Sequence, residues 1–273
     1  MFRAIAAAAA ALLLAMPAPS ATKANSGLTA QEESALRKAL DRGILIYAYD
    51  QAAWHGTDDM QTKIKDSGKL LGGWIVDGPA EAPELIFHDK NEADPQAVYV
   101  AQFRDNKLVS SRVLGSGEDR RLSPERKAII AARKAARAAL MANKASACVE
   151  QPFNTVVLPP ADGSPMLVYY LTPQTDPTAI PFGGHYRVEV TDGKVGAVRP
   201  FTRSCLSMAF KEDGDKELEA LMVTHLLDPV PTEIHVFSSL AAGKPVYVMT
   251  TKNGRLWAVE GSRVRLLPQD AKK

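Results

Sequence analysis

Hydrophobic and polar positions follow a helical period at the start of the sequence and a strand period soon after it. Apolar residues recur at helical spacing over 30–42, where Thr29 and Glu32 have the spacing of a capping box and Gly43 ends the pattern. We therefore predict a helix over 30–42. The β-branched and aromatic run 44–49 predicts a buried strand, although a continuing helix would give the same pattern.

Short apolar or alternating runs, separated by turn residues, follow from residue 69 to residue 115. This punctuation is typical of an antiparallel meander, and the last two runs should form a tight hairpin around Asp105-Asn106. The predicted strands cover 70–76, 85–88, 98–103 and 108–114.

The segment Ser123-Pro124-Glu125 has the features of a helix start: a serine cap, a proline in the first turn and an acid at the positive helix end. About 20 residues of helix should follow. Its apolar stripe is narrow and mostly alanine, so we expect it to pack closely against a sheet. The stripe consists of Ile129, Ala132, Ala136, Leu140 and Ala147.

Strand patterns resume after residue 148, and Asn253-Gly254 is the clearest hairpin turn. The run 218–227 fits a helix or a strand equally well. The predicted strands are 155–158, 166–172, 186–191, 194–198, 233–237, 246–251, 255–260 and 263–267.

Grouped strands and two separate helices predict an α+β fold, with mainly antiparallel sheets in two meanders packed with an N-terminal helix and a long central helix. We expect three parts. They are a signal peptide at 1–24, a helix-plus-meander subdomain at 25–120, and the long helix with a C-terminal antiparallel β subdomain at 121–273.

Residues 1–24 have the three-part pattern of a secretory leader, with Arg3, the apolar run 4–16 and then small residues. The run is about 13 residues, too short to cross a bilayer as a helix. We predict cleavage between Ser20 and Ala24, no membrane span, and a soluble protein in the periplasm or outside the cell.

Composition and charge exclude several classes of protein. A chain with 46% hydrophobic and 23% charged residues is neither disordered nor collagen-like. The 33 basic and 31 acidic residues become equal when the leader removes Arg3 and Lys23. A net charge of zero gives no support for binding nucleic acid, because phosphate recognition needs a sustained basic excess.

The sequence has two cysteines, Cys148 and Cys205, which lie 57 residues apart. An oxidising compartment lets such a pair persist as a disulfide, so we predict that they are bonded. Two free thiols, or one catalytic thiol, remain the alternatives. No zinc motif HExxH, P-loop, GxSxG elbow or GxGxxG is present, so we predict neither a metal nor a cofactor.

Two groups of ionisable residues could carry chemistry. The first is His55 with Asp58 and Asp59, which could bind a metal or share acid–base work. The alternatives are a polar rim of a binding site and a loop in which Thr57 or Asp58 caps a helix that starts near Asp59. The second is His185, Arg187 and Glu189, which strand alternation places on one face. They could line an anion or substrate cleft, or simply form a solvated sheet face with internal ion pairs.

Basic residues also gather on the long helix. Arg126, Arg133 and Arg137 are candidates to face an anionic partner of the envelope, with a solvated helix face as the alternative. The remaining histidines, His88, His225 and His235, are expected to be singly placed and hydrogen-bonded.

Two functions follow from these patterns. The first is an exported soluble envelope protein that binds or supports something without catalysis. The second is an exported hydrolase that uses His55/Asp58/Asp59 or His185/Arg187/Glu189. A hydrolase requires these groups to converge, because a base must lie within about 3 Å of the proton that it moves.

Overall fold

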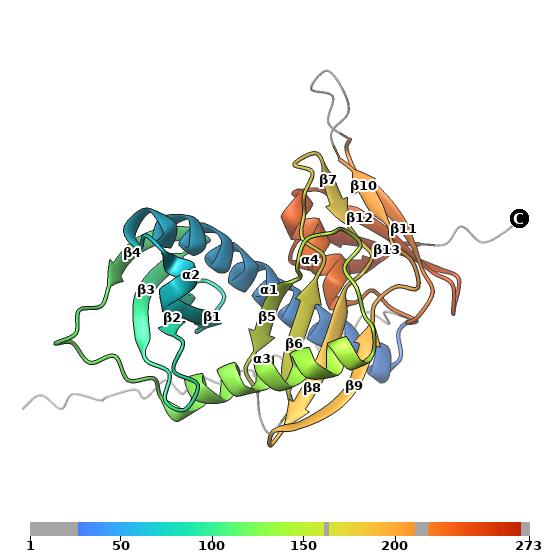
Figure 1. The fold of residues 1–273 in the computed structure, drawn as a ribbon. Coiled ribbons are helices and arrows are strands. Elements are labelled where there is room, and N and C mark those ends of the chain that lie inside the picture. Colours follow the sequence, from blue (N-terminus) through green and yellow to red (C-terminus); the bar gives the residue numbers. More distant parts are fainter. Residues whose placement is uncertain (1–26, 161–163, 211–217, 269–273) are drawn as a thin grey trace, which may run out of the picture.

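A computed structural model describes residues 27–160, 164–210 and 218–268, and these form an α+β fold as predicted (Figure 1). The described helices are α1 (Ala30–Lys63), α2 (Ser67–Leu70), α3 (Pro124–Ala142) and α4 (Glu233–Ala242). The predicted leader and its cleavage site lie outside the described residues. No described helix is long and apolar enough to cross a membrane.

The described strands form three four-stranded sheets and one two-stranded pair, mostly antiparallel. The meander sheet contains β1 (Leu71–Asp77), β2 (Glu84–Asp89), β3 (Ala97–Arg104) and β4 (Lys107–Val113). The central sheet has the order β5 (Asn154–Leu158), β6 (Met166–Leu171), β8 (Tyr186–Thr191) and β9 (Lys194–Pro200). The C-terminal sheet contains β11 (Leu221–His225), β12 (Val246–Thr250), β13 (Arg255–Glu260) and β14 (Arg263–Leu266), and the pair consists of β7 (Ala179–Pro181) and β10 (Ser207–Ala209).

The first helix continues far beyond its predicted end. It begins as expected, because the Thr29 hydroxyl accepts a hydrogen bond from the Glu32 amide in a capping box. The predicted end at Gly43 and the predicted strand over 44–49 are wrong, since α1 runs unbroken to Lys63. A Cβ on Gly43 would lie 2.4 Å from the Cβ of Val236, so this glycine lets α1 approach α4 closely.

Both faces of the meander sheet are covered, by different helices. The C-terminal half of α1 packs on the face that carries Leu85, Tyr99 and Phe103, and α3 packs on the opposite face with Ile75 and Ile86. The predicted hairpin is present between β3 and β4, and its turn residues Asp105 and Asn106 have positive φ angles of 49° and 60°. Helix α3 reaches this sheet at β1, whereas most of β4, at the other edge, is exposed.

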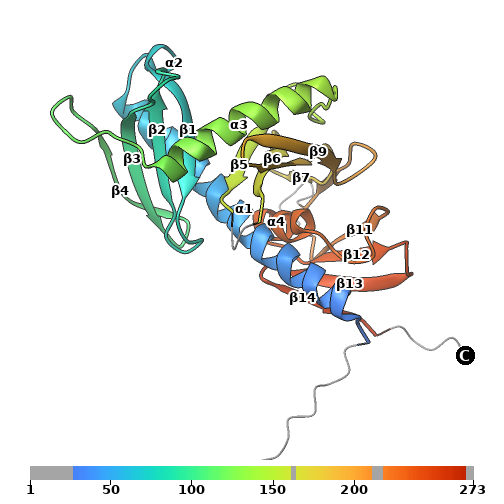
Figure 2. The ribbon, with the colours of Figure 1, turned by 90° about the horizontal axis from the view of Figure 1, so that it is seen from below.

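Helix α3 begins at the predicted residues, since the Ser123 hydroxyl accepts a hydrogen bond from the Arg126 amide at 3.3 Å. The stripe Ile129, Ala132, Ala136 and Leu140 is buried as expected, whereas Ala147 lies beyond the end of the helix. Figure 2 shows α3 crossing from the meander sheet to the central sheet, and it contacts both β1 and β5. The helix thus covers two sheets rather than one.

Helix α4 replaces a predicted strand. Residues 233–237 form its first half, and it connects the parallel neighbours β11 and β12. Nearly all of its residues are buried, so the sequence lacks the polar face that would have indicated a helix.

The ambiguous run 218–227 contains β11. The predicted hairpin between β12 and β13 is present, and it includes Gly254 with φ of 66°.

The predicted disulfide is present. Cys148 follows α3, Cys205 follows β9, and their Cα atoms are 5.4 Å apart. The bond closes a loop of 57 residues, which in the chain-entropy model stabilises a fold by about 4 kcal/mol. The division into subdomains near residue 120 stays a prediction.

Candidate functional site

The first predicted group lies along the last third of α1. His55 is half-buried and stacks on the exposed Trp54 at a centroid distance of 4.9 Å, while Asp58 is exposed. No helix starts at Asp59, because these residues lie inside α1, and the Thr57 hydroxyl donates to the Ala53 carbonyl within it. The proposed cap at this point is therefore wrong.

Asp59 connects α1 to the meander sheet through hydrogen bonds. Its carboxylate accepts hydrogen bonds from the hydroxyls of Tyr99 and Ser111, both at 2.6 Å, and pairs with Lys63 at 2.9 Å. Burial raises the pKa of Asp59, but the bonds from Ser111 and Tyr99 and the charge of Lys63 outweigh it and hold the pKa below its usual value. Asp59 is therefore an ionised structural group.

The second predicted group shares one face of β8 and the residue before it, as expected. His185, Arg187 and Glu189 lie opposite Val188 and Val190, which pack in the α3 core cluster. The face is not the solvated surface of the alternative interpretation, because His185 and Arg187 are buried and only Glu189 is partly exposed. The sequence pattern could not show that α4 covers this side.

His185 has both ring nitrogens in hydrogen bonds. Nδ1 accepts from the Thr172 amide at 3.2 Å, so Nε2 carries the proton and donates to the Pro181 carbonyl at 3.0 Å. Complete burial lowers the pKa of His185 to about 4. The ring is therefore neutral and fixed at neutral pH.

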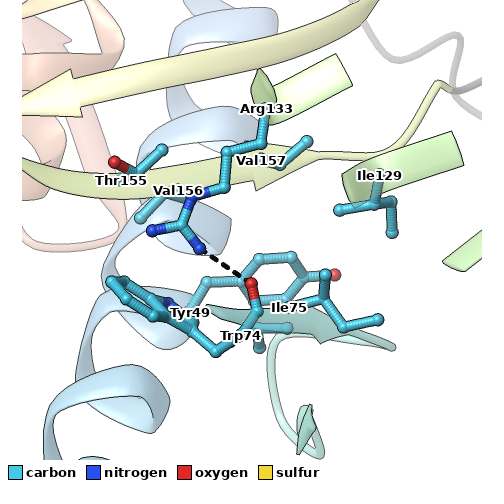
Figure 3. Close-up of a pocket in the computed structure, with 9 residues that line it drawn as sticks. Tyr49, Trp74, Ile75, Ile129, Arg133, Thr155, Val156 and Val157 are labelled. Carbon is cyan, nitrogen blue, oxygen red and sulfur yellow. Dashed lines mark hydrogen bonds between the residues drawn. The ribbon is translucent and has the colours of Figure 1, made fainter. Parts of the chain in front are cut away.

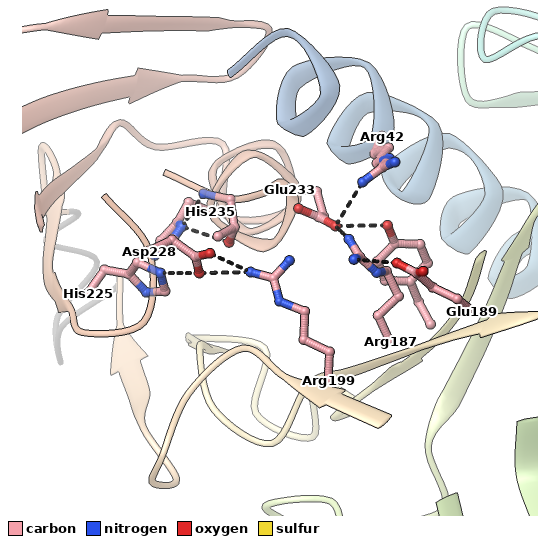
Figure 4. A network of polar contacts seen from close by, with 10 residues as sticks. Arg42, Arg187, Glu189, Arg199, His225, Asp228, Glu233 and His235 are labelled. Carbon is pink, nitrogen blue, oxygen red and sulfur yellow. Dashed lines mark hydrogen bonds and ion pairs between the residues drawn. The ribbon is translucent and has the colours of Figure 1, made fainter. Parts of the chain in front are cut away.

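Arg187 belongs to a buried ion network that joins α1, β6, β8 and α4 (Figure 4). Oε1 of Glu233 accepts hydrogen bonds from Nη1 of Arg187 at 2.7 Å and from the Tyr169 hydroxyl at 2.9 Å. Nη1 of Arg42 lies 3.9 Å from the same oxygen. Nη2 of Arg187 donates to Glu189 at 2.8 Å. Glu233 occupies the first turn of α4, where the helix dipole favours an acid. We call these residues the Glu233 network.

A second polar cluster lies beside the Glu233 network (Figure 4). Nε2 of His225 bonds to Asp228 at 2.9 Å, and Nη2 of Arg199 reaches both carboxylate oxygens of Asp228 at 2.8 Å. Burial raises the pKa of Asp228, but the bond from His225 and the charge of Arg199 hold it below its usual value. We call this the His225–Asp228 cluster.

His235 completes this cluster, with its ring edge-on to that of His225 at 4.7 Å. Nδ1 of His235 accepts from the Thr232 amide at 2.9 Å, in the geometry of a capping box for α4. Burial, and then the neighbouring His225, lower the pKa of His235 to about 3. Sequence reasoning treated these histidines as isolated. The three-residue spacings of His225 to Asp228 and Thr232 to His235 were the signals that could have paired them.

A His–Asp pair can orient an imidazole as a base for a nucleophile. Within the described ranges, the His225 ring is hydrogen-bonded to Asp228 and to no hydroxyl. The described residues also contain no group of three or more His, Cys, Asp or Glu arranged to hold a metal ion. The cluster therefore has a base and its orienting acid without the third partner.

The two predicted groups do not come together. His55 lies on α1, and Asp59 joins α1 to the meander sheet, whereas His185, Arg187 and Glu189 lie in or next to β8 of the central sheet, where Arg187 bonds to Glu233 of α4. The convergence that a shared acid–base site requires is therefore not found between these groups.

The predicted anion-facing arginines of α3 have three different settings. Arg126 is half-buried and bonds to Asp77 at 2.7 Å and to Glu84 at 2.6 Å, so its charge is compensated inside the protein. Arg133 is also turned inward, toward the seam between β1 and β5, while Arg137 is exposed as expected. The expectation fails for Arg126 and Arg133 because α3 lies across two sheets, so that its flanks also contact protein.

Two hollows accompany these features. One lies at Arg133 in the seam between β1 and β5 and has a volume of about 10 Å³. The other, of about 150 Å³, is lined by the disulfide, Thr172 and the β7–β10 pair. Neither is lined by the His225–Asp228 cluster.

Comparison of the chain with protein-family models, with curated proteins and with solved structures gives no match. The function is therefore inferred from the residues of this chain alone. The best-defined arrangements among them are the Glu233 network, the His225–Asp228 cluster and the seam at Arg133.

Proposed function

We propose that the protein is exported to the cell envelope and acts there by binding, without catalysis. The observation that carries this proposal is that the ionisable groups most suited to acid–base chemistry are committed to internal contacts. His185 uses both ring nitrogens, Asp59 holds α1 to the meander sheet, and Arg187 neutralises the buried Glu233.

Two features support export. Residues 1–24 have the pattern of a secretory leader. The Cys148–Cys205 disulfide is typical of proteins that mature in an oxidising compartment. Binding over a broad polyanion by the whole of α3 is less well supported, since Arg126, Lys127 and Lys134 are paired with acids. A local contact fits the remaining charge better.

Export and binding can be tested on the same material. The full chain, with its leader, is produced in a bacterial host and recovered from the periplasm. Its intact mass should lack the first 20 to 24 residues, and a mass that retains them would contradict export. The purified protein should then sediment in a saturable way with either peptidoglycan sacculi or vesicles of anionic phospholipid. Sedimentation with neither material would contradict the binding role.

The His225–Asp228 pair favours a second candidate, an exported hydrolase. Asp228 would orient His225, and the free ring nitrogen would act as the base. At least one of an ester, an amide, a glycoside and a phosphoester probe should be turned over by such an enzyme, and His225→Gln should abolish that turnover. Turnover with that dependence would overturn the non-catalytic proposal, whereas its absence would remove the hydrolase.

A further inference from the structure

Arg133 projects from the middle of α3 into the seam where two sheets meet edge to edge (Figure 3). One side of the seam is β1 of the meander sheet, the other is β5 of the central sheet, and Tyr49 of α1 lies below. Nη1 of Arg133 donates to the Trp74 carbonyl at 2.8 Å, and its guanidinium carbon lies 3.8 Å from the centroid of the Trp74 ring. These contacts fix the orientation of the guanidinium.

The charge of Arg133 is not balanced by an acid. Its neighbours Arg126, Lys127 and Lys134 each pair with one or more carboxylates, but Arg133 has none within 4.0 Å among the described residues. Arg137, one helical turn further on, likewise makes no ion pair with a described carboxylate. Burial, despite the Tyr170 hydroxyl nearby, and then Arg137 lower the pKa of Arg133 to about 10. The side chain is still cationic at neutral pH, so the seam holds an uncompensated positive charge.

Most hydrogen-bond donors of the Arg133 guanidinium have no partner among the described residues of the protein. A guanidinium has five N–H groups, and one hydrogen bond to protein, from Nη1 to the Trp74 carbonyl, holds this one. In the described ranges, the buried side-chain polar atoms without a partner belong to Asn106, Arg187 and Ser238. The other nitrogens of Arg133 are therefore not sealed inside the protein, and they reach the hollow or its mouth.

The hollow itself sets the size of what can enter. Its volume of about 10 Å³ is close to the space needed for one water molecule. Thr155 of β5 lines it, and the other lining residues include Ile75, Val156 and Val157. A single oxygen atom fits this space, whereas a complete polyatomic ligand does not.

We propose that the seam binds an oxyanion group, a carboxylate or a phosphate carried by a larger ligand. One oxygen of the group enters the hollow and accepts hydrogen bonds from Arg133, and the rest of the ligand stays outside, within the field of Arg137. A planar guanidinium suits both groups, because it can donate two parallel hydrogen bonds. This inference names the ligand chemistry of the proposed binding role and rests on that role.

The test follows individual resonances of the full mature chain by NMR. Sodium phosphate and sodium acetate are titrated separately at constant ionic strength, with sodium chloride as the balancing salt. The Arg133 Nε–H and the Trp74 indole N–H should shift in a saturable way with at least one of the two anions. Trp54 and Trp257 should not shift, since one is exposed on α1 and the other is buried at Thr250. The anion that binds more tightly identifies the source of the oxyanion.

Variants locate the site. Arg133→Gln should weaken binding by about tenfold or more, because it removes a charge-assisted hydrogen bond. Arg137→Gln changes an exposed residue, should fold normally, and should weaken binding by about threefold through the lost charge. Lys134→Gln is the matched control, on the same helix and with the same change of charge but directed to Glu92, and it should leave the affinity unchanged.

Two results would overturn the assignment. One is the absence of a saturable shift with both phosphate and acetate. The other is equal weakening by Arg137→Gln and Lys134→Gln, which would indicate a nonspecific response to charge. If sedimentation with envelope material persists in either case, only the seam assignment fails. If the seam binds an anion but the protein does not sediment with that material, the envelope role fails and the seam stands.

Discussion

Arg187 and Arg133 are two inward-facing guanidinium groups with opposite surroundings. Arg187 donates hydrogen bonds to the carboxylates of Glu233 and Glu189, so its positive charge is compensated inside the protein. Arg133 meets an aromatic face and a single carbonyl, and it lacks a described acid. The difference separates a charge that holds the fold together from one that is left over for a ligand.

The physical basis of the comparison is the cost of taking a charge out of water. A buried ion pair returns most of that cost through its mutual attraction, but removing one partner leaves the other charge uncompensated. A cation that contacts only an aromatic ring and a carbonyl has no charged partner, so its removal leaves no uncompensated charge behind. Replacing each arginine by methionine, which retains much of the apolar stem, should therefore give unequal results.

Arg187→Met should have the largest effect. It leaves Glu233 buried, with the Tyr169 hydroxyl and the more distant Arg42 as its remaining partners. We expect the free energy of unfolding to fall by about 3 kcal/mol in urea titrations. Arg265→Met removes an exposed pair with Glu260 and should cause no measurable change. Equal results for the two variants would show that the Glu233 network does not stabilise the fold.

Acid should affect the region around α4 next most strongly. His185 and His235 have folded-state pKa values of about 4 and 3, so below about pH 6.5 the unfolded chain binds protons that the folded chain excludes. Asp50 acts in the opposite direction, because burial raises its folded-state pKa to about 6. For these three groups the net difference is about one proton, which corresponds to a loss of about 1.4 kcal/mol of stability from pH 6 to pH 5, and burial lowers the pKa of His88 in the same direction as that of the other two histidines.

Urea titrations at several pH values check this slope. Asp50→Asn removes the opposing group and should roughly double it. Arg133 stays charged throughout this range and should contribute nothing. A flat profile between pH 6 and pH 5 would contradict the neutral state of the two histidines.

Arg133→Met should cost less than Arg187→Met by a factor of about three. It removes one hydrogen bond and a cation–π contact but strands no opposite charge, so the expected loss is about 1 kcal/mol. The same urea titration measures it. A loss as large as that of Arg187→Met would mean that Arg133 has a structural role comparable to that of the ion network.

Arg137→Gln should have the smallest effect on stability. The residue is exposed and makes no described ion pair, so the urea midpoint should not change measurably. A variant that is fully stable but binds the anion more weakly would show that Arg137 contributes to anion binding and not to the stability of the fold. A clear loss of stability would instead place Arg137 in an unrecognised structural contact.

Local signals predicted the parts of the fold that depend on local chemistry. Thr29 with Glu32 marked the start of α1, Ser123 with Pro124 marked the start of α3, and Asp105-Asn106 marked a hairpin. Each of these features satisfies backbone groups within a few residues, so tertiary contacts were not needed to foresee it.

The rest depended on packing between distant elements. Gly43 indicated a helix end, but close contact with α4 explains why a glycine lies inside a helix there. Residues 233–237 indicated a strand because a fully buried helix has no polar face. The same limit applies to the site, since nothing local distinguishes Arg126, with two acids beside it, from Arg133, with none.

The two interior glycines of α1 are the points at which this helix makes its close contacts with α4 and with the meander sheet. Gly43 meets Val236 of α4, and Gly56, thirteen positions later, meets Leu85 and Phe103 of the meander sheet. At about 100° per residue, these contact points are about 220° apart around the axis, on nearly opposite sides. One inserted residue between them would turn one partner against the other by about 100° and advance it by about 1.5 Å. The number of residues between the two glycines therefore sets the angular register in which the two ends of the molecule meet.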